Sequence, residues 1–507
     1  MIADQSNVIE YGWRRLLVTL AVSLATLLEI VDSTIVNVAL PTIQGNMGAT
    51  IDQAAWVVTG YIIANVVVIP LTPWLQRRFG RKQYYAASII GFTVASMLCG
   101  ISTTFEELVL WRIVQGLFGG GLISTSQAIL QETFPPREIG KGQAIFSLGV
   151  IIGPTLGPTI GGIITDQLSW RWVFFINLMP GIIAALLTIL LLRNPEKPQH
   201  LPVDVPGVAL LAVGIGSLQY VLEQGERNDW FADPIIVAMT AVAVLGLAAF
   251  TIWELFFAKD PVVDLHILRN RGVAAGSLLG MTLGISLYGS VLILPQFVQS
   301  ILGFTATLSG EQIFVRAIAI GVLTPLAAAL ATKGKIDTRL QIFAGFLLIA
   351  ISSALQATVT TTQSSFWTFG AALVVGGIGL SQIFVPLSMT LFRAAPPREV
   401  PKVAAFFNLA RQLGGSVATA ILVTIVDRRD AFHYALLAGT ATLHRAPIAQ
   451  YLSHATPLQL YELLHGQALT LAFADTAWWT AIISAVLAPL VFLMRRPRAA
   501  AGPVPAE

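Results

Sequence analysis

The chain has 507 residues, of which 55% are hydrophobic and only 11% are charged. Soluble globular domains carry about 25% charged residues, so this composition excludes a soluble protein and indicates one that spans a membrane. The formal net charge of +3 is too small to indicate a nucleic-acid partner, and the single cysteine, Cys99, excludes an intramolecular disulfide and a cysteine-based metal cluster.

Fourteen apolar runs follow one another along the chain, and each is long enough to cross a bilayer as an α-helix. The first run is too long for the apolar core of a signal peptide, so we expect it to remain as a span. The sequence therefore predicts an all-α integral membrane protein surrounded by lipid. The predicted helices cover residues 16–40, 54–75, 83–103, 106–130, 141–165, 171–192, 204–222, 234–257, 272–297, 309–331, 340–360, 366–392, 403–426 and 470–494.

Lysine and arginine are divided unevenly between the loops on the two sides of the membrane. An even number of spans puts both termini on one side, and the loops of that side hold most of the basic residues. The loops of the other side hold only Arg171, Arg227, Arg428, Arg429 and Arg445. Because positive charge collects on the cytoplasmic side, we expect a multi-pass protein with both termini in the cytoplasm.

A short sequence recurs at an offset of 261 residues, as PPREIGKGQAIF at 135–146 and as PPREVPKVAAFF at 396–407. Both copies lie in a predicted cytoplasmic loop. Parallel repeats of this kind are found in transporters built from two related halves. We therefore expect two six-helix halves, residues 1–193 and 259–507, with two further helices inserted between them in residues 194–258.

The predicted outer segment at 427–469 is much longer than the other outer loops. Its four histidines are His433, His444, His454 and His465. One interpretation is metal binding, and the other is a pair of amphipathic periplasmic helices that carry exposed histidines. We favour the second interpretation, and we expect a segment of this length to dock another protein.

The first span contains two acidic residues, Glu29 and Asp32, which are three residues apart and so lie on nearly the same face of a helix. A carboxylate inside a bilayer costs roughly 2.5–3.5 kcal/mol even on lenient insertion scales, so it normally faces a cavity or a partner. The pair is therefore predicted to be a proton-coupling or ion site.

Arg112 opens the fourth span in the run VLWRIVQGLFGGG, at about the same predicted depth as Asp32. A charge pair between them is therefore geometrically feasible. In one interpretation Arg112 controls protonation of the carboxylate. In the other, a permanent ion pair only locks two helices together. We favour the first, because a buried acid has little structural use.

The fifth span reads SLGVIIGPTLGPTIGG. Glycine recurs every four residues, which makes a flat stripe for close helix approach, and two prolines remove backbone hydrogen bonds and bend the helix. Two Gly-Pro steps four residues apart are rare in a helix that only packs, so we predict a conformational motif. Its members are Gly149, Gly153, Pro154, Gly157, Pro158, Gly161 and Gly162.

Other polar and aromatic residues within the spans are candidates for a substrate cavity, although the amides are more often interhelical contacts. Arg316 and Arg411 differ from the amides, because cations in a mostly apolar cavity favour an anionic or weak-acid substrate. The alternative for Arg316 is that Glu311, five residues earlier, neutralises it. The predicted substrate-binding residues are Asn37, Gln115, Gln127, Tyr288, Gln296, Phe297, Arg316, Asn408 and Arg411.

On these stretches, together with LEIVDSTIVNVALPTI in the first span and WRWVFFINLMPG at 170–181, the chain resembles the major facilitator superfamily. It is most similar there to the fourteen-span drug:proton antiporters of the EmrB/QacA type. The resemblance implies that Asp32 is the protonation site, that Arg112 belongs to a motif for proton transfer, and that the glycine-proline helix distinguishes exporters from importers. It also implies a bacterial inner membrane and a role in antibiotic resistance.

One loop departs from the pattern of that superfamily. Between the second and third spans the family usually has a glycine at the first position and an acid at the fifth, where this chain has Pro73 and Arg77. We therefore assign no gating role to a carboxylate there. Relatives with a basic residue at this position and a long last outer loop work with a periplasmic adaptor and an outer-membrane channel, so the resemblance implies a tripartite pump.

The expected function is proton-coupled multidrug efflux, which exports amphipathic or weak-acid toxic compounds and needs no cofactor beyond the proton gradient. The alternative is a dedicated exporter or importer of one metabolite on the same fold. An enzyme is not expected, because the spans contain neither His-Glu-x-x-His nor Gly-x-Ser-x-Gly. No metal site and no ATP-binding motif are expected either.

Overall fold

The computed structural model describes residues 9–135, 138–194, 197–199, 201–333, 337–441, 450 and 456–494, and the regular elements within them are all helical. Thirteen helices are long and apolar enough to cross a membrane, and one further pair of bent segments makes a fourteenth span. The predicted all-α membrane fold with fourteen spans is thus confirmed. Some spans extend well past their apolar runs, most clearly the first (Gly12–Met47) and the thirteenth (Val400–Thr440).

The first six spans contain nine α-helices, because glycine and proline break several spans into shorter pieces. These helices are α1 (Gly12–Met47), α2 (Ile51–Val68), α3 (Thr72–Phe79), α4 (Arg81–Ile101), α5 (Phe105–Gly119), α6 (Leu122–Thr133), α7 (Ile139–Gln167), α8 (Trp172–Phe175) and α9 (Leu178–Leu191). The 3-10 turn η2 (Ile69–Leu71) joins α2 to α3.

The remaining spans are α10 (Val205–Gln224), α11 (Pro234–Ile252), α12 (Arg271–Ser300), α13 (Ala306–Lys333), α14 (Thr338–Val359), α15 (Gly370–Ser381) with α16 (Phe384–Arg393), α17 (Val400–Thr440) and α19 (Pro457–Leu487). Short turns flank them: η3 (Glu226–Asn228), η4 (Trp230–Ala232), the π-turn η5 (Trp253–Phe257), η6 (Leu265–Arg269), η7 (Phe366–Phe369), η8 (Pro397–Glu399) and η9 (Ala488–Leu493).

Side chains at the helix starts explain where several spans begin. The Thr50 and Thr104 hydroxyls accept hydrogen bonds from backbone N–H groups in the first turns of α2 and α5. Asp204 and Asp233 do the same for the two helices α10 and α11. Each cap satisfies a backbone donor that has no partner within its own helix. Short polar residues between the apolar runs therefore set the span boundaries.

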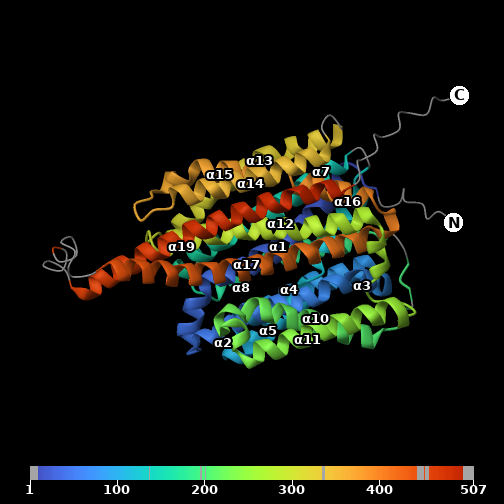
Figure 1. The fold of residues 1–507 in the computed structure, drawn as a ribbon. Helices are drawn as coiled ribbons and strands as arrows, with labels where there is room; N and C mark the ends of the chain where they lie inside the picture. The colour runs from blue at the N-terminus through green and yellow to red at the C-terminus, as the bar shows by residue number, and fades with distance from the viewer. Residues whose placement is uncertain are drawn as a thin grey trace.

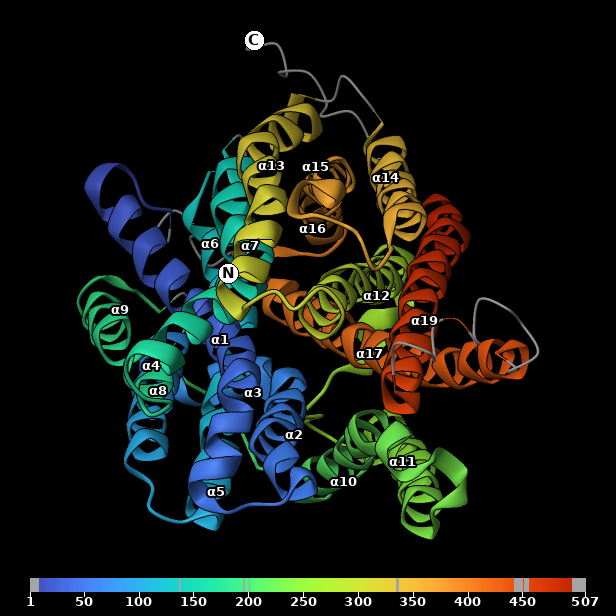
Figure 2. The ribbon, with the colours of Figure 1, turned by 90° about the vertical axis from the view of Figure 1, so that its left-hand side faces the viewer.

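The helices run side by side along one long axis (Figure 1). Helix α1 begins and η9 ends at the same end of the bundle, while α17 and α19 extend past the other end. Viewed along that axis (Figure 2), α10 and α11 lie at one edge, where α10 contacts both α2 and α17. The division into residues 1–193, 194–258 and 259–507 stays a prediction, but the inserted helix α10 bridges helices from both proposed halves.

The glycine stripe of α7 packs on α1. A Cβ atom added at Gly153 would overlap Ile30, and one added at Gly157 would overlap Thr34. The next stripe member, Gly161, lies against Ile35 in the same way. The two halves of α7, Ile139–Pro154 and Leu156–Gln167, meet at an angle of 47°. The predicted close approach and the proline bend are therefore both present.

The predicted outer segment at 427–469 differs from the expectation of separate helices with exposed histidines. Its described parts continue α17 to Thr440 and begin α19 at Pro457, so they lengthen two spans into one projecting hairpin. His433 is mostly buried and lies 2.8 Å from Asp475, which also accepts a hydrogen bond from Arg429. These contacts join α17 to α19, so the histidine is part of the hairpin's packing.

Of the other three histidines in this segment, the structure describes only His465. His465 stacks on Tyr461 and lies 3.6 Å from Asp430, again between α17 and α19. His444 and His454 lie outside the described residues. Within the described residues no group of three or more histidine, cysteine, aspartate or glutamate side chains is arranged to hold a metal ion.

Two glycine-to-alanine substitutions in the α7 stripe should differ in their effect on the free energy of unfolding. Gly157→Ala should destabilise the fold by about 1–3 kcal/mol, because its methyl group overpacks the contact with Thr34. Gly149→Ala is the matched control, because a Cβ there meets no atom within 4 Å. It should be neutral or stabilising by up to about 1 kcal/mol through helix propensity. Thermal unfolding of the purified proteins in detergent measures both, and equal effects would contradict the packing.

Candidate functional site

A fully buried ion pair joins the first and fourth spans. Arg112 Nη1 on α5 lies 2.6 Å from Asp32 Oδ2 on α1, and both side chains are 0% exposed. The charge pair predicted from matching depths is therefore present. Two opposite charges at this distance, away from water, attract each other far more strongly than they would at a surface.

Two amides complete the surroundings of the Asp32 carboxylate. Gln115 Nε2 donates to Oδ1 over 2.9 Å, and Asn177 Nδ2 donates to the same oxygen over 2.7 Å. Asn177 comes from the turn before α9, and it also donates to Ser96 Oγ on α4. The carboxylate therefore connects α1, α4, α5 and the start of α9, and its N–H donors complement the charged form.

Arg112 is held by more than its partner carboxylate. Its Nε donates to the backbone oxygen of Val57 on α2 over 2.9 Å, and Nη1 also donates to Gln115 Oε1. The guanidinium lies 4.2 Å from the centre of the Tyr61 ring, a favourable cation–π arrangement. Nη2 has no hydrogen-bond partner in the described part of the chain. The network therefore leaves one buried donor open.

Glu29 lies in a separate set of contacts, although it is only one helical turn from Asp32. Asn65 Nδ2 on α2 donates to Oε1 over 2.9 Å, and the backbone N–H of Ile123 donates to Oε2 over 3.1 Å. Ile123 is in the first turn of α6, just after the break between α5 and α6. The carboxylate thus lies at the positive end of that helix. Each of the two acids has its own donors.

A second polar contact joins α6 to α17. Asn408 Nδ2 donates to Gln127 Oε1 over 2.8 Å, and both side chains are buried. A further contact between the two proposed halves is the hydrogen bond that Ser388 on α16 donates to Gln143 on α7 over 3.3 Å. Gln127 and Asn408, both predicted to bind substrate, therefore face each other across the junction between the two proposed halves.

The two interior arginines of the second half are both buried. Arg411 on α17 is 3% exposed, and no carboxylate within the described residues lies at ion-pair distance from it. Its Nε atom is buried without a hydrogen bond. Arg316 on α13 is equally buried and lies beside Gly376 of α15. Arg411 thus adds a buried positive charge that forms no ion pair within the described residues, and the Glu29 carboxylate is close enough to interact with it electrostatically.

The remaining predicted substrate residues are scattered. Phe297 lies inside a core cluster, edge-on to Phe369 and Phe473, so it packs helices together. Tyr288 is half-buried against Gly415, and Asn37 and Gln296 are exposed. Gln115 belongs to the Asp32 network described above. Of this group the structure places Phe297 in a core cluster and leaves Asn37 and Gln296 exposed.

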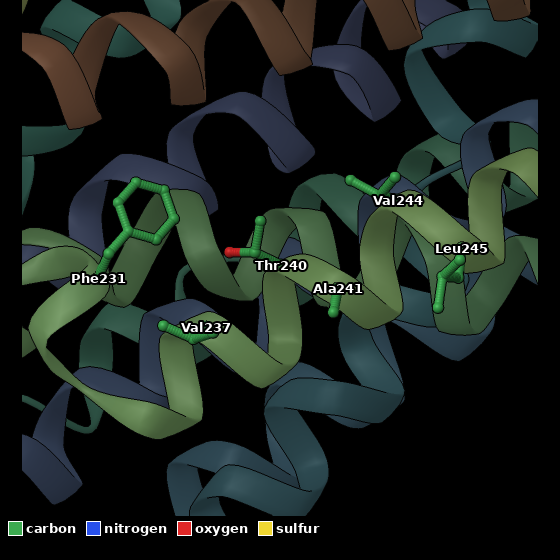
Figure 3. Close-up of a pocket in the computed structure, with 6 residues that line it drawn as sticks. All are labelled: Phe231, Val237, Thr240, Ala241, Val244 and Leu245. Atoms are coloured by element: carbon green, nitrogen blue, oxygen red, sulfur yellow. The ribbon is translucent and has the colours of Figure 1, made fainter.

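An apolar groove lies elsewhere, along the outer face of α11 (Figure 3). Thr240 is the one hydroxyl among the labelled side chains, and it is already bonded to the backbone oxygen of Ile236. The groove faces away from the charge network and suits lipid chains. Its lining residues are Phe231, Val237, Thr240, Ala241, Val244 and Leu245.

At the end of the bundle where the chain begins, the second copy of the repeated sequence forms an ion pair. Lys402 Nζ lies 2.7 Å from Asp264, in the loop before α12, and Arg77 at the end of α3 lines the same small pocket. Partial burial disfavours the charged acid, but Lys402 and the backbone N–H of His266 outweigh it and lower the pKa of Asp264. Asp264 therefore lies in the same pocket as Arg77, the basic residue that stands where the superfamily usually has an acid.

Six residues that contact Asp32, Glu29, Arg112 or their partners were missed from the sequence: Val57, Tyr61, Asn65, Ser96, Ile123 and Asn177. Val57 acts through its backbone, which no side-chain pattern reveals. Asn65 and Asn177 were visible as isolated amides within apolar runs, the same signal that identified Gln115. Such amides within spans are costly unless they are bonded. Ser96 could not be separated from the many small hydroxyls that bond their own helix.

A double-mutant comparison tests the ion pair. Arg112→Gln and Asp32→Asn should each destabilise the protein by about 3–5 kcal/mol, because each leaves a buried charge without its partner. The double variant should lose clearly less than the sum of the two, since both charges are then gone. Thermal unfolding in detergent measures this, with the exposed Asp166→Asn as a control. Additive losses would show that the two side chains do not interact.

Comparison with known proteins shows to which family this chain belongs. Residues 22–419 match the family model of the Major Facilitator Superfamily. The multidrug export protein EmrB of Escherichia coli strain K12 is 33% identical over 502 residues, which cover 97% of each chain. EmrB of Haemophilus influenzae is 34% identical over 87% of this chain and 86% of its own, and the fatty acid resistance protein FarB of Neisseria gonorrhoeae is 34% identical over 86% of each.

Solved structures support the same fold. The crystal structure of the human organic anion transporter MFSD10 aligns with a TM-score of 0.59 at 14% identity, over 94% of this chain and 100% of the other. The proton:xylose symporter XylE aligns with a TM-score of 0.55 at 14% identity, over 94% and 95%. At this identity the likeness concerns the fold alone. By its family match and its relatives, this chain belongs to the major facilitator superfamily and is an EmrB-like transporter, not an enzyme.

Proposed function

We propose that this protein is a proton-coupled multidrug exporter whose proton site is Asp32. The observation that carries the proposal is the fully buried Asp32–Arg112 pair, which the chain maintains at membrane depth. The multidrug export proteins among its relatives support drug efflux. Residues without a function are rarely kept charged within a membrane, so a titratable pair there points to coupling.

In the proposed cycle, a proton from outside neutralises Asp32 and removes the charge that holds Arg112. The guanidinium keeps its contacts with Val57 and Gln115, but the ion pair that joins α1 to α5 is lost. The helices around α1 can then shift against α7, along the close glycine contact. Proton release toward the cytoplasm restores the pair and returns the transporter to its starting state. Glu29, which holds the start of α6, is a second acid that could respond to the same shift.

The substrate class that we propose is amphipathic, including weak acids. Arg411 supplies an interior positive charge with no carboxylate partner among the described residues. The name of the fatty acid resistance protein FarB, one of the relatives, agrees with recognition of an acid. The amide pair Gln127 and Asn408 lies one turn from Arg411 and adds polar contacts. Adaptable amides beside one cation suit a range of compounds.

We also propose the assembly and orientation predicted from the sequence. The protein resides in the bacterial inner membrane with its termini in the cytoplasm, and it joins a periplasmic adaptor and an outer-membrane channel. The projecting hairpin of α17 and α19 supports this, because it extends past the bundle on the side opposite to the start of α1. Exposed Phe432 and Leu436 on the hairpin offer apolar contact area.

Drug accumulation in cells tests proton coupling. Cells that express the wild-type chain with its adaptor should accumulate less ethidium, and a protonophore should abolish the difference. Asp32→Asn should lose at least tenfold of the efflux rate, because the variant has no carboxyl to protonate. Asp166→Asn, which removes an exposed acid, should export normally. Protonophore-sensitive export by Asp32→Asn would move the proton site elsewhere, and insensitive wild-type export would exclude proton coupling.

A second experiment tests the role of Arg411. Arg411→Gln should lose resistance to a long-chain fatty acid by about tenfold or more, because the interior then lacks a charge for the carboxylate, while export of cationic ethidium should be retained. Arg411→Lys should restore part of the fatty-acid resistance, since it keeps the charge. Growth inhibition and dye efflux measured in the same strains separate the two substrates. Equal losses for both substrates would assign Arg411 a structural role.

A further inference from the structure

The inserted helix α10 carries a carboxyl group that the mechanism above does not use. Glu223 lies near the end of α10, within the span, and is half-buried. Its neighbours are neutral: Gln219 Nε2 donates to Glu223 Oε1 over 2.9 Å and to Ser416 Oγ on α17 over 2.7 Å. Among the described residues no basic side chain forms an ion pair with it, in contrast to the arrangement around Asp32.

The surroundings of Glu223 favour its neutral form. The titratable or charged groups on the elements packed around this part of α10 are Tyr61 on α2, Arg411, Asp427 and Arg428 on α17, Asp233 at the start of α11, and Glu226 and Arg227 in η3. The nearest acid in the chain, Glu226, accepts hydrogen bonds from Trp230 and Thr424. Glu226 is therefore held in contacts of its own, and the side chain that donates to Glu223 is a neutral amide. A carboxyl group in such surroundings takes up a proton readily.

The amide beside Glu223 is incompletely bonded. Gln219 is fully buried, and its Oε1 atom has no hydrogen-bond partner in the described part of the chain. A buried acceptor without a donor is unfavourable. Protonation of Glu223 creates an O–H donor, and rotation of the Gln219 amide then lets Oε1 accept from it. The orphaned acceptor is therefore complementary to the protonated acid.

Helix α2 lies between this carboxyl group and the Asp32 network. Gln224, next to Glu223, donates to Thr59 on α2 over 3.0 Å. Two residues earlier, the backbone oxygen of Val57 accepts from Arg112. The side chains of residues two apart on a helix point in nearly opposite directions. Because the Val57 side chain packs in a core cluster with Ile35 of α1, α2 contacts α10 on one face and the helices of the charge network on the other. Figure 2 shows α2 between α10 and the helices of the network.

We propose that Glu223 is a second proton-carrying carboxyl, so that each transport cycle moves one proton at Asp32 and another at Glu223, on opposite sides of α2. This inference rests on the proposed proton coupling and deepens it. When Glu223 gains a proton, the Gln219 amide rotates and its bond to Ser416 changes. The contact between α10 and α17 is thereby altered at the same time as the contact between α1 and α5.

Proton uptake by the purified full-length protein tests the inference without a substrate. Infrared spectra recorded against pH show protonated carboxyl groups directly. The wild type should show a band that Glu223→Gln removes and Asp32→Asn retains. The isosteric glutamine should keep the contacts with Gln219 and Ser416, and a normal unfolding temperature would establish that. The control is Glu106→Gln, which removes an exposed acid near the start of α5. Retention of the band in Glu223→Gln would overturn the proposal.

A second experiment measures the number of protons moved per ethidium molecule, in proteoliposomes under set pH gradients. Glu223→Gln should reduce the number of protons moved per dye molecule from about two to about one, and Glu223→Asp should restore it. An unchanged proton number in Glu223→Gln would overturn the second site while leaving Asp32 coupling intact. The proposed function itself fails in a different way, if the wild type exports dye without any dependence on the pH gradient.

Discussion

The buried charge of Asp32 constrains much of the first half of this molecule. A carboxylate at membrane depth needs a counter-charge and several hydrogen-bond donors, and these come from α4, α5 and the start of α9. Arg112 in turn needs acceptors beyond one carboxylate, and it takes the backbone oxygen of Val57 on α2. Most first-half spans are thereby tied to one ion pair. A change in the charge of Asp32 acts on all of them together.

Close helix packing determines how those spans can respond. Because glycine lies on α7 wherever α1 approaches most closely, the two backbones meet without intervening side chains. The proline bend of 47° falls within the same helix. The contact therefore has few interlocking side chains, as the proposed movement of α1 against α7 requires. Both the charge network and the glycine contact involve α1, so the proposed proton site and the proposed conformational motif share one helix.

The two helices α10 and α11, which the sequence predicts as an insertion between the halves, have different surroundings. Helix α10 bonds to α2 through Gln224 and to α17 through Gln219, so it joins helices of both proposed halves. Helix α11 has many exposed apolar side chains, and its two threonines, Thr240 and Thr251, bond to backbone oxygens of the same helix. Helix α10 thus bonds to helices of both proposed halves, whereas α11 packs mainly on α10.

The sequence by itself determined the number of spans, the position of the bent helix and the identity of the central ion pair. Each of these follows from a local or periodic signal: apolar length, the Gly-Pro steps, and rare charges within apolar runs. The chain alone could not show that Glu29 and Asp32 use separate donors, because both lie on one helix face and the donors come from α2 and from the break before α6. It also could not show that Phe297 packs in a core or that Asp475 pairs with Arg429 and His433. Those contacts depend on the rotation of whole helices about their axes, which only the packing of the complete bundle decides.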